Sequence, residues 1–73
     1  MKFSDALNIM QAGADICREG WNGSNLFIRI IIDVRCDNKA WIGLFQNNQL
    51  ITPWTASQTD MLANDWLQLP NKR

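Results

Sequence analysis

The segment 26–34, Leu-Phe-Ile-Arg-Ile-Ile-Ile-Asp-Val, constrains the fold most, because apolar residues occupy both of the faces that a β-strand presents. Its many β-branched residues predict a central strand. Arg29, Asp33 and Arg35 fall on alternate positions, so we expect them to share one face, yet neither face is polar throughout. A strand of this kind needs cover on both sides. We expect a helix over one face and a second subunit over part of the other.

The start of the chain supplies the expected helix. Apolar residues recur there at helical spacing, namely Phe3, Ala6, Leu7 and Met10. Ser4 is a candidate N-cap and Gly13 a candidate C-terminal stop. Together they predict a short amphipathic helix near residues 4–12.

The remaining segments predict an α+β fold: a short N-terminal helix packed on a small antiparallel β-sheet, with a short helical turn before the last strand. Strands are expected at residues 14–18, 26–34, 40–45, 50–52 and 66–69. Turns are expected at residues 19–24, 37–38 and 46–49, where glycine, asparagine and aspartate gather.

A chain of 73 residues makes one domain, 1–73, whose core alone is marginal, because so small a domain buries only about 60% of its unfolded surface. Cys17 and Cys36 can form one disulfide at most. No charged start leads into a long apolar run, so we expect no secretory signal and reduced thiols. With no histidine there is no zinc site, and we expect no metal or cofactor. Homo-oligomerisation, as a dimer or tetramer, is the remaining source of stability.

The charge balance bears on the partners. Seven basic and seven acidic residues cancel, whereas proteins that bind nucleic-acid polymers carry a basic face. The longest apolar run is too short to span a bilayer. We therefore expect neither a nucleic-acid polymer nor a membrane as partner.

The chain lacks the usual groups of an active site. Histidine, the common general base near neutral pH, is absent. Cys17 stands beside Arg18, but neighbours in a strand point to opposite faces. Asp60 and Asp65 are the remaining pair, and their spacing across a helical turn does not place them on one face. We expect a binding module and not an enzyme.

The segment 53–66, Pro-Trp-Thr-Ala-Ser-Gln-Thr-Asp-Met-Leu-Ala-Asn-Asp-Trp, has the composition of a ligand site. Indole faces such as that of Trp54 stack on nucleobases, at about 1–3 kcal/mol per base. Donors and acceptors for sugar or base edges follow it, namely Ser57, Gln58, Thr59 and Asp60.

The same segment also has a structural interpretation. Ser57 and Asp60 have the spacing of a capping box, which would begin a short helical turn before a closing strand at Trp66. Both interpretations can hold, because a helix N-terminus also presents free amide groups to anions.

A second unusual segment is the glycine-rich turn 19–24. Asn22-Gly23 between extended runs is a strong hairpin signal, because the turn requires positive φ. Trp21 beside it either contacts a ligand or an interface, or covers the core.

Several motifs resemble those of the second Thoeris anti-defence family, a family of small phage proteins. They are Phe-x-x-Ala-Leu at 3–7, Gly13, Gly-Trp-Asn-Gly at 20–23, and the long segment 53–66. The resemblance implies a sponge that holds, without cleaving it, the cyclic ADP-ribose-type signal of an infected bacterium's TIR enzyme, with cyclic dinucleotides also bound by some members. It further implies a helix on an antiparallel sheet, a homotetramer with pockets where two protomers meet, and the host bacterial cytoplasm as its location.

Carried over by position, the family's ligand contacts correspond to Trp21, Asn22, Trp54, Ser57, Gln58, Thr59 and Asp60. Trp21 or Trp54 would stack on adenine, Gln58 and Thr59 would bind ribose hydroxyls or the base edge, and Asp60 would accept from ribose or cap the turn. For the pyrophosphate the candidates are Arg18, Arg29, Arg35 and the turn at Ser57.

The middle of the chain departs from the family. Residues 40–43, Ala-Trp-Ile-Gly, stand where family members carry a Pro-His-Ile-Asp-type segment, and Trp41 either fills the vacated space or lies in the core. A different class of function is also open, a protein-interaction module with Trp21, Trp41 and Trp54 as anchors. A weaker third hypothesis is a nucleotide hydrolase acting through Asp60 and Asp65.

Overall fold

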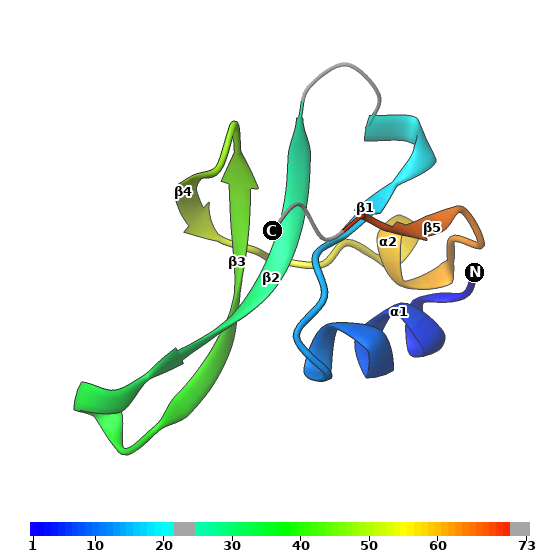
Figure 1. The fold of residues 1–73 in the computed structure, drawn as a ribbon. Coiled ribbons are helices and arrows are strands. Elements are labelled where there is room, and N and C mark those ends of the chain that lie inside the picture. The colour runs from blue at the N-terminus through cyan, green and yellow to red at the C-terminus, as the bar shows by residue number, and fades with distance from the viewer. Residues whose placement is uncertain (22–24, 71–73) are drawn as a thin grey trace.

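The computed structural model describes residues 1–21 and 25–70, and in this part of the chain five antiparallel strands form one sheet in the order β4-β3-β2-β1-β5 (Figure 1). The elements are α1 (Phe3–Gln11), β1 (Ile16–Arg18), η1 (Glu19–Trp21), β2 (Leu26–Asp33), η2 (Val34–Cys36), β3 (Lys39–Gln46), β4 (Gln49–Pro53), α2 (Gln58–Leu62) and β5 (Trp66–Gln68). The predicted α+β class, with its N-terminal helix and its short helix before the last strand, is confirmed.

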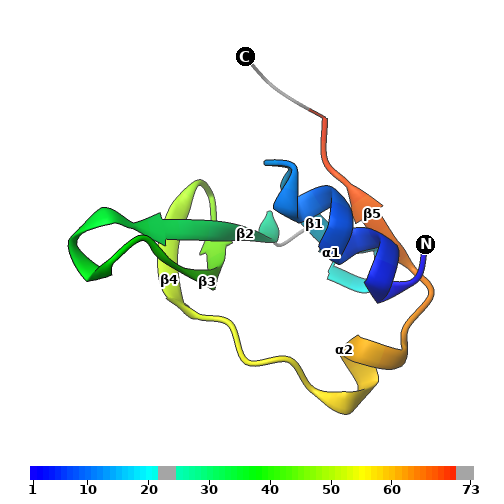
Figure 2. The same cartoon turned by 90° about the horizontal axis from the view of Figure 1, so that it is seen from below.

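The strands at the two ends of the chain meet in the sheet. The short strand β1 pairs with β2 at Ile16↔Ile28 and with β5 at Cys17↔Leu67. Strands β2 and β3 pair along their whole length, from Leu26↔Gln46 to Asp33↔Lys39. The connection from β4 to α2 therefore runs past β3 and β2 toward the β1–β5 side of the sheet, as the long yellow segment in Figure 2 shows.

Two tight turns follow the sequence prediction. Asn47 and Asn48 join β3 to β4 with φ of 52° and 65°, and Asp37 and Asn38 join η2 to β3 with φ of 54° and 58°. Two-residue hairpin turns require positive φ at both positions, which asparagine and aspartate tolerate.

The first helix begins earlier than predicted. Ser4 lies inside α1, and the N-cap is Lys2, whose side chain makes no capping bond, so the predicted Ser4 cap is wrong. The cause is a contact distant in sequence: Trp66 N donates to Met1 O at 3.2 Å, which fixes the first residue against β5. The end is as predicted, because Gly13 has a φ of 107° directly after the last turn.

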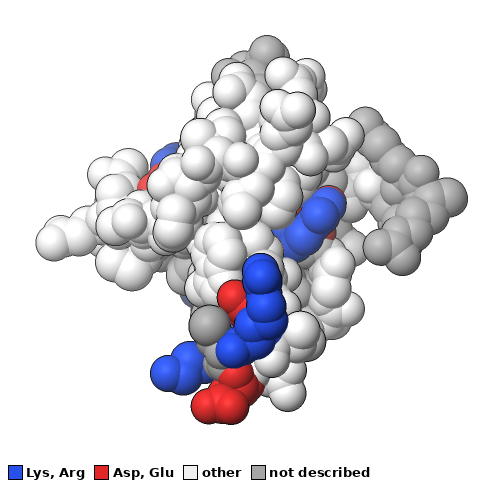
Figure 3. All heavy atoms as spheres, turned by 90° about the vertical axis from the view of Figure 1, so that its left-hand side faces the viewer, with Lys and Arg blue, Asp and Glu red and all other residues white. Residues whose placement is uncertain are grey.

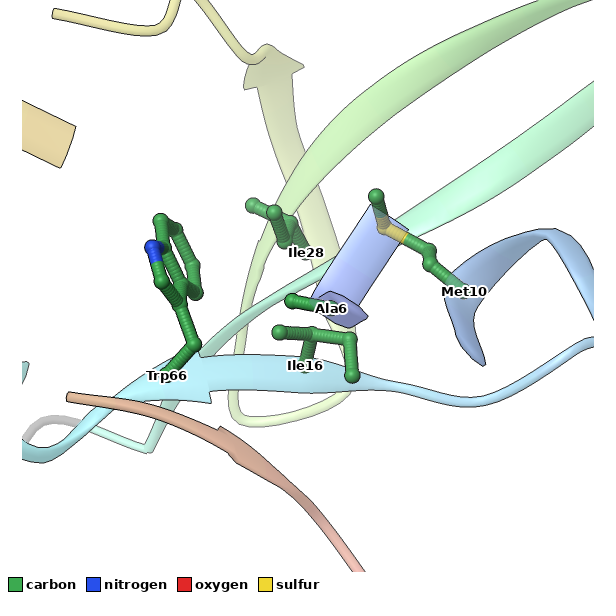
Figure 4. Close-up of a cluster of buried hydrophobic side chains, with 5 residues drawn as sticks. All are labelled: Ala6, Met10, Ile16, Ile28 and Trp66. Atoms are coloured by element: carbon green, nitrogen blue, oxygen red, sulfur yellow. The ribbon is translucent and has the colours of Figure 1, made fainter. Parts of the chain in front are cut away.

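The core lies between α1 and the β1-β2-β5 part of the sheet. Its fully buried side chains come from four elements and converge on one another in Figure 4, which labels Ala6, Met10, Ile16, Ile28 and Trp66. Trp66 has no exposed surface and its Nε1 donates to Asp60 O at 3.0 Å. The indole therefore joins the core to α2.

The opposite face of the sheet carries a second apolar layer. Phe27 and Phe45 pair across β2 and β3 and stack with ring centroids 5.1 Å apart and an interplanar angle of 6°. Gly43 allows Ile31 and Leu50 to approach, since an added Cβ would lie 2.8 Å from the Cδ1 atom of each. The predicted two-faced character of the central strand is confirmed.

Beyond α1 the β2–β3 hairpin continues as an arm, residues 31–41, that projects from the rest of the molecule (Figure 1). Ile32 and Val34 on this arm are 62% and 76% exposed. Trp41 pairs with Ile31 there and is half-buried, away from the core under α1. Among the described residues, no helix is long and apolar enough to cross a membrane.

Candidate functional site

Arg18 joins two carboxylates of the predicted C-terminal motif to the sheet. From β1, its Nη1 donates to Asp60 Oδ1 at 2.9 Å and its Nε to Asp65 Oδ1 at 2.8 Å. The sequence spacing predicts that Asp60 and Asp65 do not lie on one face, but in the structure both carboxylates contact the same arginine. The chain turns back between α2 and β5, so both carboxylates reach one guanidinium, whose forked donors serve two acceptors at once.

This arrangement keeps both carboxylates ionised. Burial alone would raise the pKa of Asp60, but hydrogen bonds from Arg18 and Ser57 outweigh it and lower that pKa below its ordinary value. The hydrogen bond from Arg18 also lowers the pKa of Asp65, against a smaller opposing effect of burial. An acid–base pair needs one member that holds a proton near neutral pH, and neither does here.

The capping box predicted for the start of α2 is confirmed. Asp60 N donates to Ser57 Oγ at 3.0 Å, and Ser57 N donates to Asp60 Oδ2 at 3.3 Å. Asp60 therefore caps the turn, as the structural interpretation of the segment had it. Gln58 and Thr59 are exposed in the first turn of α2.

The two tryptophans proposed for stacking both pack on Trp66. Trp21 meets it edge-on at 5.5 Å between centroids, and Trp54 does so at 6.0 Å. Phe3 lies 5.3 Å from Trp66 and 5.9 Å from Trp54. Both tryptophans remain half-buried, so each has a structural role and some surface left for contact. Asn22 falls outside the described residues.

A hollow of about 1190 Å³ lies on the sheet face opposite α1, where β1, β2 and β5 meet. Among the predicted ligand contacts, Trp21 borders it, whereas Trp54 and residues 57–60 lie elsewhere in the described structure. The structure therefore separates the two motifs: the first reaches the hollow, and the second forms α2 and its cap. Drug-sized ligands occupy cavities of roughly 300–1,000 Å³, so the hollow has room for a nucleotide.

Arg29 borders the hollow. From the sequence it was only one of several arginines that could bind a phosphate. Its Nε and Nη2 donate to Asp15 Oδ1 and Oδ2 at 2.7 and 2.9 Å. Its guanidinium carbon lies 4.9 Å from the Phe45 centroid and 5.2 Å from that of Phe27. The hydrogen bonds to Asp15 raise the pKa of Arg29 further, against the smaller opposing effect of burial, so the group is always charged.

Sequence reasoning missed the polar rim of the hollow. Asn25 Nδ2 donates to Asn47 Oδ1 at 2.8 Å, and Asn47 N donates to Asn25 O at 3.3 Å. These bonds tie the start of β2 to the β3–β4 turn. The sequence offered only a weak indication of this contact, because asparagine side chains in turns usually form hydrogen bonds with the backbone of their own turn.

The other candidate groups are less suited to a site. The prediction that Arg35 shares a strand face with Arg29 and Asp33 is wrong, because Arg35 lies in η2, after the end of β2. Its side chain is 91% exposed, and its Nε lies 3.8 Å from Asp33 Oδ1. Cys17 is free, and burial raises the pKa of its thiol, which disfavours the reactive thiolate. The described residues contain no cluster of three or more metal-ligating side chains.

Two comparisons relate this chain to known proteins. The sequence model of the Thoeris anti-defense 2-like domain (Tad2-like) matches residues 1–68. Thoeris anti-defense 2 of Bacillus phage SP01 is 32% identical over 81 aligned residues, which cover 90% of this chain and 91% of that protein.

Proposed function

This chain belongs to the Thoeris anti-defense 2 family of phage anti-defence proteins, and on that premise we propose that it sequesters a cyclic nucleotide immune signal without cleaving it. The signal is of the cyclic ADP-ribose type, with a cyclic dinucleotide as a second possible ligand. The match of the family's sequence model to residues 1–68 carries the proposal. The place of action is the cytoplasm of the infected host bacterium.

The carboxylates support binding without cleavage. Asp60 and Asp65 are both paired with Arg18, and the pKa of each is lowered, so neither is a proton donor near neutral pH. The raised pKa of the Cys17 thiol weighs against a thiolate nucleophile. A protein with these groups can hold a phosphoanhydride, but it offers little to break one.

The hollow is the place we propose for the ligand. It borders Trp21 of the first family motif, and its walls combine aromatic and aliphatic residues with amide side chains, two arginines and two carboxylates. Such a mixture of apolar walls with a few polar groups is typical of ligand sites. The second motif acts through Trp54 and Asp60, which hold the core and α2 in place behind Trp21.

Exposed apolar residues support homo-oligomerisation, as a dimer or tetramer. Ile32 and Val34 on the arm and Ile51 on the edge strand β4 are all more than half exposed. In Figure 3, which views the molecule from the side of β4 and the arm, uncharged residues dominate and the basic and acidic atoms adjoin one another. A second copy would cover this surface and could close the open side of the hollow.

The decisive experiment separates a sponge from an enzyme. The protein is mixed with a cyclic ADP-ribose isomer at about a hundred times the dissociation constant, where binding should add about 2.7 kcal/mol of stability. The mixture is then heat-denatured and the nucleotide is analysed by chromatography. We expect a raised melting temperature and quantitative recovery of intact nucleotide, whereas hydrolysed product at catalytic turnover would refute the proposal.

The alternative, a protein-interaction module anchored by exposed tryptophans, has less support. Trp21 and Trp54 pack edge-on against Trp66, and Trp41 is half-buried on the arm, so their indoles are not presented as free anchors. Interface hot spots are usually large residues that become fully desolvated only on binding. The absence of a melting shift with every cyclic nucleotide, together with capture of one specific protein, would favour this alternative.

A further inference from the structure

Arg29 packs on a pair of aromatic rings and is also exposed at the hollow. Its guanidinium lies over the stacked rings of Phe27 and Phe45, which are only 5% and 8% exposed although the described part of the chain places no helix on them. The side chain is nevertheless 43% exposed, and it borders the hollow. A flat, charged group is thus presented to whatever occupies that space.

The orientation of this group is fixed. Asp15 accepts two hydrogen bonds from Arg29, at 2.7 and 2.9 Å, in the forked geometry that matches a carboxylate to a guanidinium. A pre-oriented arginine loses little conformational entropy on binding, which favours a stacking contact over a mobile side chain.

Charge argues against a phosphate as the group that Arg29 receives. The charged residues that line the hollow are two arginines, Arg18 and Arg29, and two carboxylates, Asp15 and Glu19. Arg29 is neutralised by Asp15, and Arg18 is already shared by two further carboxylates. An added phosphate would compete with Asp15, whereas a neutral heteroaromatic ring could stack on the exposed part of the guanidinium and leave that pair intact.

The rim supplies hydrogen bonds at a suitable distance. Asn25 directly precedes β2 and is two residues from Phe27, against which the Arg29 guanidinium lies. The chain can separate two such residues by at most about 7 Å, which is close to the long dimension of a purine. After their mutual bond, Asn25 still offers Oδ1 and one N–H, and Asn47 still offers both of its amide N–H groups. Amide side chains of this kind recognise the edges of adenine.

We propose that the nucleobase of the bound signal stacks on the exposed guanidinium of Arg29 while the Asn25–Asn47 pair binds its edge. This assignment rests on the proposed function, because it places one part of the proposed ligand. It differs from the expectation that an indole of Trp21 or Trp54 stacks on the base. Trp21 then borders the sugar side of the hollow.

The first test needs no variant. The isotope-labelled protein is titrated with adenosine 5′-monophosphate and, separately, with ribose 5-phosphate, while NMR follows the Arg29 Nε–H and the Asn25 and Asn47 amide signals. We expect the nucleotide to move these signals and the base-free sugar phosphate to leave them in place. Equal responses to the two probes, or no response to either, would overturn the stacking site.

The second test uses a conservative variant with a matched control. Arg29→Lys keeps the charge but loses the plane, and Arg35→Lys makes the same change at an exposed arginine remote from the hollow. We expect Arg29→Lys to weaken binding of cyclic ADP-ribose about tenfold or more, within the range that one stacked base contributes. Arg35→Lys should bind like the parent protein.

The outcomes separate this inference from the proposed function. If cyclic ADP-ribose binds the parent and Arg29→Lys equally, the Arg29 stack is wrong and sequestration stands. If the parent ignores cyclic ADP-ribose and every other cyclic nucleotide while adenosine 5′-monophosphate moves the Arg29 signal, the stack stands and sequestration is wrong. If neither nucleotide has any effect, both are wrong.

Discussion

Arg18 and Asp60 are 42 residues apart in the sequence, and their side chains meet at 2.9 Å. The contact links the sheet to α2, a helix of five residues that would not persist on its own. Asp65 adds a second carboxylate to the same guanidinium at 2.8 Å. The segment that looks most like a ligand site in the sequence is therefore, in its charged residues, the connection that holds α2 and the Trp66 core together.

We expect Asp60→Asn to destabilise the protein by about 1–3 kcal/mol, because it removes the charge partner of Arg18 in a partly buried site and weakens the capping box. Urea unfolding measures the change. Asp37→Asn is the control, since Asp37 is exposed in a turn with positive φ that asparagine tolerates. Equal stability of both variants would show that the Arg18 contact contributes nothing.

The same residues predict a pH dependence. The pKa values of Asp60 and Asp65 are lowered in the folded state, so their stabilising effect is complete above the ordinary aspartate pKa of about 4. The effect is lost as the pH falls through the lowered folded-state values. Urea unfolding at pH 7 and at pH 3 should show a smaller acid-induced loss for Asp60→Asn than for the parent, and an unchanged loss would contradict the prediction.

Trp21→Ala and Trp54→Ala should both destabilise the fold but differ in binding. Each change loses an edge-on contact with Trp66, worth about 0.5–1.5 kcal/mol beyond the lost burial, and Trp54→Ala also loses the contact with Phe3. Only Trp21 of the two borders the hollow in the described structure. Calorimetry with cyclic ADP-ribose should therefore detect a loss for Trp21→Ala alone, with the oligomer intact. The reverse pattern would place the ligand beside the 53–66 segment.

Gly43→Ala tests the packing of the second apolar layer. A methyl group there would come within 2.8 Å of the Ile31 and Leu50 Cδ1 atoms and 3.3 Å of Phe45 Cε1. The two Cδ1 atoms end flexible side chains, whereas the Phe45 ring is stacked on Phe27, so we expect a cost of about 1 kcal/mol. Gly20→Ala is the matched control, because its nearest neighbour is Asp65 Oδ2 at an ordinary 3.8 Å. Thermal melts of the two variants measure the difference, and similar melting temperatures would show that the layer adapts freely.

The arm should matter for self-association. Ile32→Lys changes an exposed residue, so the fold of one protomer should change by less than about 0.5 kcal/mol. A second copy that covers the arm would instead have to bury the new charge. Sedimentation analysis should show a shift toward monomer at unchanged helix and sheet content, and an unaltered oligomer would place the interface elsewhere.

Local patterns were sufficient to predict some of this structure. The Ser57 and Asp60 capping box, the Asn47-Asn48 turn and the stop at Gly13 depend on contacts within a few residues, and each is present. The start of α1 was mispredicted because a contact between Met1 and Trp66 decides it, and no local pattern reports that contact.

The candidate site was less predictable because it depends on sheet register. Asp15 can reach Arg29 only because β1 lies beside β2, and Asn25 can reach Asn47 only because β2 and β3 are aligned from Leu26↔Gln46 onward. In the sequence Arg29 is a charged residue within an apolar strand, and this was the one feature that pointed to the hollow. Its partners follow from the topology.

The position of β1 between β2 and β5 also governs how the protein is made. The indole of Trp66 completes the core, and the backbone of Trp66 pairs β5 with β1 opposite Arg18. A nascent chain therefore cannot close its core until Trp66 has been translated. Until then strand β1 lacks its β5 neighbour, and the core face of β2 is without the Trp66 side chain that helps to cover it. Contacts between distant parts of a chain form slowly, which makes the interval before Trp66 arrives the period in which this protein is most exposed to aggregation and proteolysis.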